Sequence, residues 1–227
     1  MSNLTLFHGS QQIIETPLFA YGKTTNDYGQ GFYCTEHLDL AKEWACTENS
    51  DGFANRYQLE SKNLNILNLH EDQFNTLHWL SILVSNRTFD LATPIMRQAV
   101  FFLKEEYSIN LQKYDAILGY RADDSYFAFA KMFLSNQISY SQLSKAMMLG
   151  ALGDQFVLKS KKAFEAITFT GFEIAPKSEF LSKKIQRMNK AKEDFHKLID
   201  NYSITEEDLF MTDFILGKVS KNDARLR

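Results

Sequence analysis

Hydrophobic residues along this chain follow two different spacings, which predicts a protein built from both strands and helices. Short apolar runs bounded by turn residues are typical of buried strands. They occupy residues 4–8, 31–35, 53–59, 64–67, 116–118, 155–160 and 166–173. Apolar residues that recur every three or four positions predict helices instead. This spacing occurs at residues 38–45, 73–84, 94–106, 126–134 and 140–149.

The pattern changes after Pro176, where charged residues become frequent. Apolar residues keep a three-and-four spacing over residues 183–198, which predicts an amphipathic helix, and residues 204–227 form a second segment of this kind. We therefore expect a main domain at residues 1–176 and a helical extension at residues 177–227. The extension either packs on the main domain or offers a docking surface to a partner or substrate.

Composition narrows the class of protein. A length of 227 residues is enough for one domain with a sizeable core. Lys and Arg number 25 against 28 Asp and Glu, so we expect no general attraction to nucleic acid or an anionic membrane, although a local basic groove stays open. No stretch nears the ~18 apolar residues of a membrane span, and no secretion signal is visible, which predicts a cytoplasmic protein. Cys34 and Cys46 fit a reducing compartment and have no metal-ligand spacing, so we expect structural roles and no metal site.

The first motif with candidate chemistry is the run Leu6-Phe7-His8-Gly9-Ser10, at the end of the first predicted strand. Because glycine has no Cβ, the backbone at Gly9 can approach a flat ligand closely and offer its N–H and C=O groups. A planar amide would fit such an edge. The alternative is that His8 is a structural residue.

A second motif, Asp27-Tyr28-Gly29-Gln30-Gly31-Phe32-Tyr33, joins a glycine turn to the second predicted strand. Side chains alternate along a strand, so Phe32 and Tyr33 point to opposite faces. Trp44 lies eleven positions after Tyr33, on the next predicted helix. Tyr33 and Trp44 can therefore face each other across a slot that suits a flat heteroaromatic ring. The alternative is that these rings only pack together.

The order of these motifs resembles the ADP-ribosyltransferase superfamily, in the branch of diphtheria toxin and the poly(ADP-ribose) polymerases, which carries a His-Tyr-Glu triad on three strands. Residues 6–10 look like its first-strand motif, and residues 28–33 look like its glycine turn and second strand. Residues 154–158 look like the third strand motif. The resemblance spans roughly residues 4–175 and implies an α+β fold of split mixed and antiparallel sheets flanked by helices, followed by the C-terminal helical extension.

The resemblance implies that NAD is the substrate. Its nicotinamide would lie between Tyr33 and Trp44, its carboxamide on the Gly9 backbone, and its adenosine ribose near His8. Ala41 stands where the family has a small residue. The full set of residues expected to bind NAD is His8, Gly9, Ser10, Tyr28, Gly31, Phe32, Tyr33, Ala41 and Trp44.

One departure from the family pattern concerns the third motif, where Gln155 stands at the place of the catalytic Glu. An amide cannot offer the full negative charge that stabilises an oxocarbenium-like centre, although it can still hydrogen-bond a ribose hydroxyl. Some members of the superfamily lack this Glu and transfer a single ADP-ribose unit. The departure therefore disfavours chain-building polymerase activity and favours mono-transfer.

A polar cluster at residues 119–127 supplies further candidates for catalysis. Arg121 can hold a pyrophosphate or pair with an aspartate. Of Asp123 and Asp124, one can cap the following helix, and one can supply the charge that Gln155 lacks or act as general base for the acceptor. The cluster also resembles one in an uncharacterised bacterial toxin-type family of the same superfamily, often encoded beside a small partner gene, which implies an antitoxin partner.

The leading hypothesis is an NAD-dependent mono-ADP-ribosyltransferase, a bacterial toxin or phage-defence effector that modifies a protein or a nucleic acid. Two alternatives stay open: an NAD glycohydrolase, in which water replaces the acceptor, and a catalytically inactive module that binds NAD or ADP-ribose. A stripe of basic residues can contact acceptor phosphates, or can simply be a solvated helix face. It comprises Lys159, Lys161, Lys162, Lys177, Lys183, Lys184, Arg187, Lys190 and Lys192.

Overall fold

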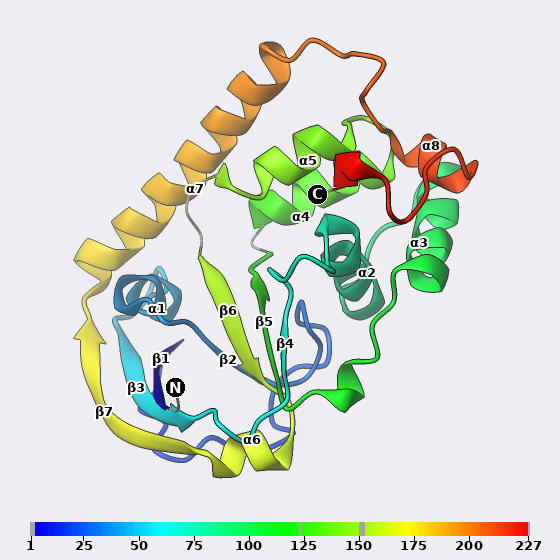
Figure 1. The fold of residues 1–227 in the computed structure, drawn as a ribbon. Helices are drawn as coiled ribbons and strands as arrows, with labels where there is room; N and C mark the ends of the chain where they lie inside the picture. Colours follow the sequence, from blue (N-terminus) through cyan, green and yellow to red (C-terminus); the bar gives the residue numbers. More distant parts are fainter. Residues whose placement is uncertain (1–2, 123, 150–152, 227) are drawn as a thin grey trace.

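Two open sheets and a set of surrounding helices make up this α+β protein (Figure 1). The computed structural model describes residues 3–122, 124–149 and 153–226, apart from the side chains of residues 124 and 125. At this level the predicted fold class is confirmed. No helix in these described ranges is both long and apolar enough to cross a membrane.

The first sheet has three antiparallel strands in the order β1-β3-β7. The second has four strands in the order β2-β6-β5-β4, of which only the β4–β5 pair is parallel. The strands are β1 (Asn3–Ser10), β2 (Phe32–Cys34), β3 (Gly52–Glu60), β4 (Ile66–Asn68), β5 (Ala116–Tyr120), β6 (Asp154–Leu158) and β7 (Ile167–Ala175). Phe7 and Thr35 exchange backbone hydrogen bonds of 2.7 and 2.9 Å, which bring β1 of one sheet beside the end of β2 in the other.

Several helices begin where the sequence offers capping groups. Asn75 and Ser139 each form a capping box at the start of α2 and α5, and Thr93 caps α3 ahead of a proline at its first position. The helices are α1 (Leu38–Ala45), α2 (Thr76–Asn86), α3 (Pro94–Glu106), α4 (Asp124–Leu134), α5 (Tyr140–Ala146), α6 (Lys161–Glu165), α7 (Lys177–Asp200) and α8 (Met211–Ile215). Short 3₁₀ turns occupy Leu111–Lys113 and Ala224–Leu226.

Helix α1 lies directly on the backbone of the first sheet. A Cβ at Gly9 on β1 would be 2.1 Å from the carbonyl oxygen of Ala41, and one at Gly52 on β3 would be 2.3 Å from that of Ala45. Such distances are far shorter than any van der Waals contact, so both positions require glycine as long as the helix stays this close. Part of the space that glycine leaves at position 9 is therefore filled by α1.

The second sheet and helices α2–α5 enclose the larger core, and the C-terminal residues contribute to it. Phe195 of α7 stacks on Phe129 of α4 with ring centroids 3.7 Å apart. Phe214 of α8 and Leu226 are buried in the same cluster. Phe195, Phe214 and Leu226 thus belong to the core of the main domain, whereas Phe180 of α7 packs in a smaller cluster with Ala45 and Ala175.

The predicted helix over residues 204–227 was wrong for most of that segment, because helix is confined there to α8 and the 3₁₀ turn. Local side-chain bonds explain the breaks. Asp208 accepts from the Thr205 N–H, and Asp213 accepts from the Phe210 N–H, so each holds a turn. Gly217, with a φ of 69°, then follows the end of α8.

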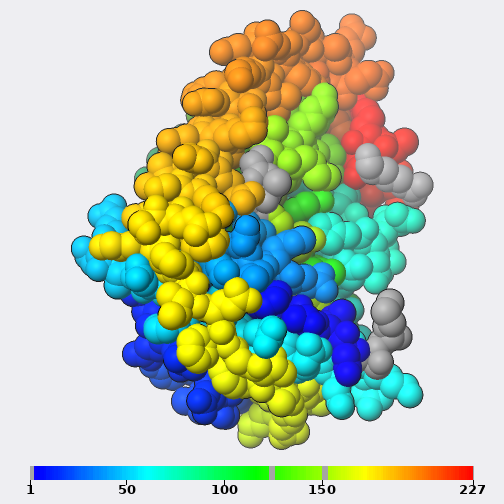
Figure 2. All heavy atoms as spheres, turned by 90° about the vertical axis from the view of Figure 1, so that its left-hand side faces the viewer, coloured from blue at the N-terminus to red at the C-terminus, as the bar shows by residue number. Residues whose placement is uncertain are grey.

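Helix α7 runs along one side of the molecule and continues from β7, as the yellow and orange atoms of Figure 2 show. It is held to α1 by a two-pronged ion pair: Arg187 donates from Nε and Nη2 to the Glu43 carboxylate at 3.0 and 2.8 Å. The Glu43 side chain is almost fully buried, whereas about a quarter of the Arg187 side chain is exposed to solvent. Arg187 is therefore an anchor of the fold.

Other members of the predicted basic stripe also have partners inside the chain. Lys183 pairs with Glu179 and Lys190 pairs with Asp194 along the exposed side of α7. Lys159 donates to the carbonyl oxygens of Tyr28 and Gln30, and burial lowers its pKa to about 8. The stripe is thus not a uniform row of solvated cations.

Replacing Arg187 with Ala should lower the free energy of unfolding by about 2–3 kcal/mol, because it leaves the Glu43 carboxylate buried without its cation. Denaturant unfolding measures this. Lys183→Ala is the matched control on the same helix and should leave the midpoint unchanged, because its ion pair is exposed. Equal effects of the two substitutions would contradict the anchoring role.

Candidate functional site

A cavity of about 420 Å³ lies where the two sheets approach each other beside α1. It is lined by side chains or backbone from β1, β2, α1, β6 and the segment after β5. Among the residues singled out in the sequence, the structure brings together here His8, Gly9, Gly31, Phe32, Tyr33, Trp44, Arg121 and Gln155. Motifs far apart in the sequence thus meet in one cavity.

A hydrogen bond to the backbone fixes which ring nitrogen of His8 carries the proton. Its Nδ1 lies 2.6 Å from the carbonyl oxygen of Tyr33 on the neighbouring β2 strand. A carbonyl oxygen only accepts hydrogen bonds, so Nδ1 carries the proton. Burial lowers the pKa of His8, an effect that the Tyr33 carbonyl partly opposes. The neutral ring therefore keeps a lone pair on Nε2, which can accept a hydrogen bond from a ligand hydroxyl.

The two aromatic residues of β2 have different tasks. Phe32 is buried, and its ring stacks on that of His8 with centroids 4.4 Å apart. The Tyr33 hydroxyl donates to the carbonyl oxygen of Gly29 at 2.6 Å and accepts from the N–H of Tyr28 at 3.0 Å. Because Gly29 has a φ of 73°, this hydroxyl braces a turn that favours glycine. Burial raises the pKa of Tyr33, so the hydroxyl stays protonated.

Trp44 extends into the cavity from the last turn of α1. The Arg121 guanidinium lies over its ring, with the central carbon 4.2 Å from the ring centroid. A flat ligand that stacks on this face of Trp44 therefore has to displace Arg121. The other role considered for Arg121 was pairing with an aspartate. Burial raises the pKa of Asp27, and the attraction of Arg121 is one of the influences that oppose this rise.

Asp27, Arg87 and Asn26 also line the cavity, and the sequence motifs did not single out these residues as site residues. Asp27 is 5% exposed, and its Oδ2 accepts from the N–H of Ala122 at 3.0 Å. Arg87 Nη1 lies 3.3 Å from the other carboxylate oxygen. Burial raises the pKa of Asp27, whereas the Ala122 N–H and Arg87 act to lower it.

Buried polar atoms without a hydrogen-bond partner gather at this cavity. Within the described part of the chain they are Oδ1 of Asp27, Nε1 of Trp44 and Oε1 of Gln155, and all three residues line it. Leaving a buried donor or acceptor unsatisfied costs roughly 1–3 kcal/mol. The wall of the cavity therefore offers to a polar ligand the Trp44 N–H as a donor and the Gln155 oxygen as an acceptor, besides the Asp27 oxygen that lies beside Arg87.

Several of the predicted site residues lie elsewhere. Tyr28 is buried in the core, where its hydroxyl donates to the carbonyl oxygen of Tyr120. Ala41 is buried on the face of α1 that packs against Gly9, and Ser10 accepts from the N–H of Gln12. None of these three is among the cavity-lining residues of the described chain.

The two aspartates proposed for catalysis are only partly placed. Asp123 lies outside the described residues. Asp124 is the first residue of α4, and its side chain is likewise outside the description. Their proposed roles, as helix cap, charge or general base, therefore stay predictions.

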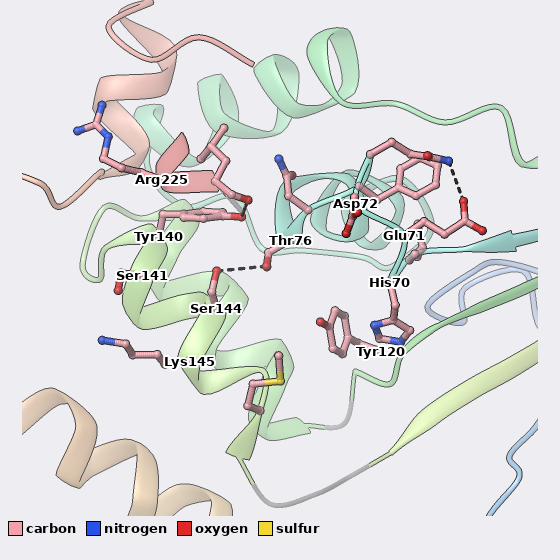
Figure 3. Close-up of a pocket in the computed structure, with 16 residues that line it drawn as sticks. His70, Glu71, Asp72, Thr76, Tyr120, Tyr140, Ser141, Ser144, Lys145 and Arg225 are labelled. Atoms are coloured by element: carbon pink, nitrogen blue, oxygen red, sulfur yellow. Dashed lines mark hydrogen bonds between the residues drawn. The ribbon is translucent and has the colours of Figure 1, made fainter. Parts of the chain in front are cut away.

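A second, larger groove of about 1050 Å³ lies on the side of α5 (Figure 3). His70 and Tyr120 lie next to each other on one wall, and Tyr140, Ser144 and Lys145 come from α5. Two of the groups that line it have charged partners: His70 pairs with Asp154, and Arg225 pairs with Asp223. The unpartnered buried atoms named above are not in its lining. We therefore take the smaller cavity as the candidate site.

Fold and cavity together define an α+β protein with a cavity between two sheets that carries buried polar atoms in its lining. Residues 4–169 match the family model described as "Protein of unknown function (DUF3990)". The match covers well over half of the chain, so the chain belongs to this family. No curated protein and no solved structure matches it.

The protonation state assigned to His8 can be tested by an NMR titration of the histidine rings. His8 should titrate below the ordinary value of 6.5 because of its burial. His70 is the internal control and should titrate above 6.5, because its hydrogen bond with Asp154 favours the charged ring. A His8 midpoint above 6.5 would contradict the neutral ring.

The lowered pKa of His8 also makes the stability of the folded protein depend on pH. Unfolding exposes His8, and below pH 6.5 the unfolded chain binds this proton before the folded chain does. The contribution of His8 to the free energy of unfolding is therefore complete above the pKa of the unfolded state. It is lost as the pH falls toward the lower pKa of the folded state.

Proposed function

We propose that this protein is an NAD-dependent mono-ADP-ribosyltransferase, a toxin or defence effector that modifies a protein or a nucleic acid. The observation that carries the proposal is the meeting of three motifs in one cavity: His8 on β1, Tyr33 on β2 and Gln155 on β6. The His8–Tyr33 hydrogen bond links the first two, and β6 pairs directly with β2. This arrangement supports the resemblance to the His-Tyr-Glu branch of the ADP-ribosyltransferase superfamily, with its split sheets.

The cavity offers suitable chemistry for the nicotinamide, a ribose and the pyrophosphate of NAD. Aromatic rings of Tyr33 and Trp44 line a space for nicotinamide, and the Gly9 backbone offers hydrogen-bonding groups for its carboxamide. The free Nε2 of His8 can accept from a ribose hydroxyl. Arg87 and Arg121 also line the cavity, and either could bind the pyrophosphate by turning from its present contact with Asp27 or the Trp44 ring.

Transfer of one unit is favoured over chain building. The position that carries Glu in the resembling branch is Gln155, which is 6% exposed and neutral. It can hydrogen-bond a ribose hydroxyl of NAD but cannot supply a formal negative charge. The acceptor of the ADP-ribose unit is either a protein or a nucleic acid. The pairing of Arg187, Lys183 and Lys190 within the chain removes some support from the basic stripe as a nucleic-acid contact.

Incubation with NAD that is radiolabelled in its adenosine part distinguishes the candidate activities. We expect free nicotinamide and label on a macromolecule from a cell extract. Nicotinamide release without macromolecular label would indicate a glycohydrolase instead. If the protein binds NAD but releases no nicotinamide, it is an inactive binding module, and the proposed function is wrong. Growth arrest on expression, relieved by a co-expressed partner, would support the predicted toxin and antitoxin.

Replacing His8 with Ala should lower the rate of nicotinamide release by about 100-fold, because a ligand-facing hydrogen-bonding group is lost from a preorganised site. His196→Ala, on the exposed side of α7, is the control and should retain the full rate. Circular dichroism checks that both variants fold. An active His8→Ala enzyme would contradict the site assignment.

A further inference from the structure

We infer that Asp27 supplies the catalytic carboxylate that Gln155 cannot supply, from a position beside Gln155 in the cavity wall; the inference rests on the proposed function. The placement of Asp27 is the first support. It is an acidic residue that lines the cavity and is 5% exposed. A buried carboxylate is costly, so its presence at a ligand cavity calls for a physical reason.

The two oxygen atoms of the Asp27 carboxylate are used differently. Oδ2 accepts from the backbone N–H of Ala122, which fixes the orientation of the group. Oδ1 is buried and has no hydrogen-bond partner, although Arg87 lies 3.3 Å away. One oxygen is thus held by a backbone hydrogen bond, and the other has only the ion pair with Arg87, so it can still accept a hydrogen bond from a ligand.

Gln155 is the immediate neighbour of this carboxylate. A hydrogen bond from its side chain is one of the influences that lower the pKa of Asp27, although burial raises that pKa overall. Its own Oε1 is buried without a partner. Charge and amide are therefore placed side by side, so a carboxylate at either position would act on nearly the same point in the cavity.

The proposed reaction needs negative charge at that point. The bond between the ribose carbon and the nicotinamide nitrogen breaks, and its electron pair leaves with nicotinamide, which becomes neutral. The ribose carbon, now positively charged, accepts an electron pair from the acceptor nucleophile, whose proton passes to water. A carboxylate a few ångströms away in a poorly solvated site lowers the energy of the cationic stage by several kcal/mol.

A purely structural role would also explain the bonds of Asp27 to Ala122 and Arg87, so the experiment has to separate the two roles. Asp27→Asn keeps the size of the side chain and an oxygen for the Ala122 N–H, and removes only the charge. A second change, Gln155→Glu, puts the charge back on the neighbouring side chain. Only a catalytic role predicts that the second change rescues the first.

We expect Asp27→Asn to lower kcat for nicotinamide release by about 100-fold or more. The dissociation constant for NAD should change by less than about threefold, because the charge acts on the cationic stage. The double variant Asp27→Asn, Gln155→Glu should recover to within about tenfold of the wild type. Asp115→Asn is the matched control, because Asp115 also accepts from a backbone N–H, that of Asn65, but lies outside the cavity lining; it should retain the wild-type kcat.

Gln155→Glu alone tests the inference without disturbing Asp27. With a carboxylate already present, it should raise kcat by less than about tenfold, whereas a site that lacks one should gain about 100-fold. Full activity of Asp27→Asn, failure of Gln155→Glu to rescue it, or a large gain from Gln155→Glu alone would each overturn the inference while the proposed function stands. A wild-type protein that releases no nicotinamide would instead overturn the proposed function.

Discussion

The close contact between α1 and the first sheet is the constraint on which the rest of the site depends. Gly9 and Gly52 allow this contact because they have no Cβ. A Cβ at these positions would be only 2.1 and 2.3 Å from carbonyl oxygens of α1. The helix is held from its other side by the Glu43–Arg187 pair with α7. Because Trp44 is the next residue after Glu43, the same packing that anchors α1 also directs Trp44 into the cavity.

A second consequence of this architecture is the polar character of the cavity wall. The two sheets meet through the bridge between Phe7 and Thr35, and the chain between β1 and β2 supplies Asp27 to the wall. Buried atoms of Asp27, Trp44 and Gln155 have no partner there, which costs free energy in the folded protein. Such a cost is typical of sites that are shaped for a ligand rather than for stability. We attribute the arrangement to the ligand proposed above.

Much of the fold followed from spacing alone. The helices predicted over residues 38–45 and 94–106 have the observed bounds, because their apolar faces and end signals agree. The segment 204–227 was predicted wrongly, because its apolar residues are buried by separate turns that Asp208 and Asp213 hold. The short α6 was missed, because five residues are too few for a clear period.

The site was predictable only where motifs named its residues. His8, Tyr33, Trp44 and Gln155 share a cavity, as their motifs suggested, whereas Tyr28 and Ala41 are buried and do not line it. Asp27 belongs to the glycine-turn motif of residues 27–33, and yet it was not predicted to be a site residue. Its importance comes from the Ala122 N–H, which is 95 residues away in the sequence, and no local pattern carries that contact.

The most direct test of this account is a crystal structure of the protein with a non-hydrolysable NAD analogue. The account predicts the nicotinamide ring beside Tyr33 and Trp44, its carboxamide on the Gly9 backbone, and the ribose next to it within hydrogen-bond distance of Asp27 and Gln155. An analogue bound in the groove beside His70 and Tyr140 instead, with the cavity at Gly9 unchanged, would contradict it.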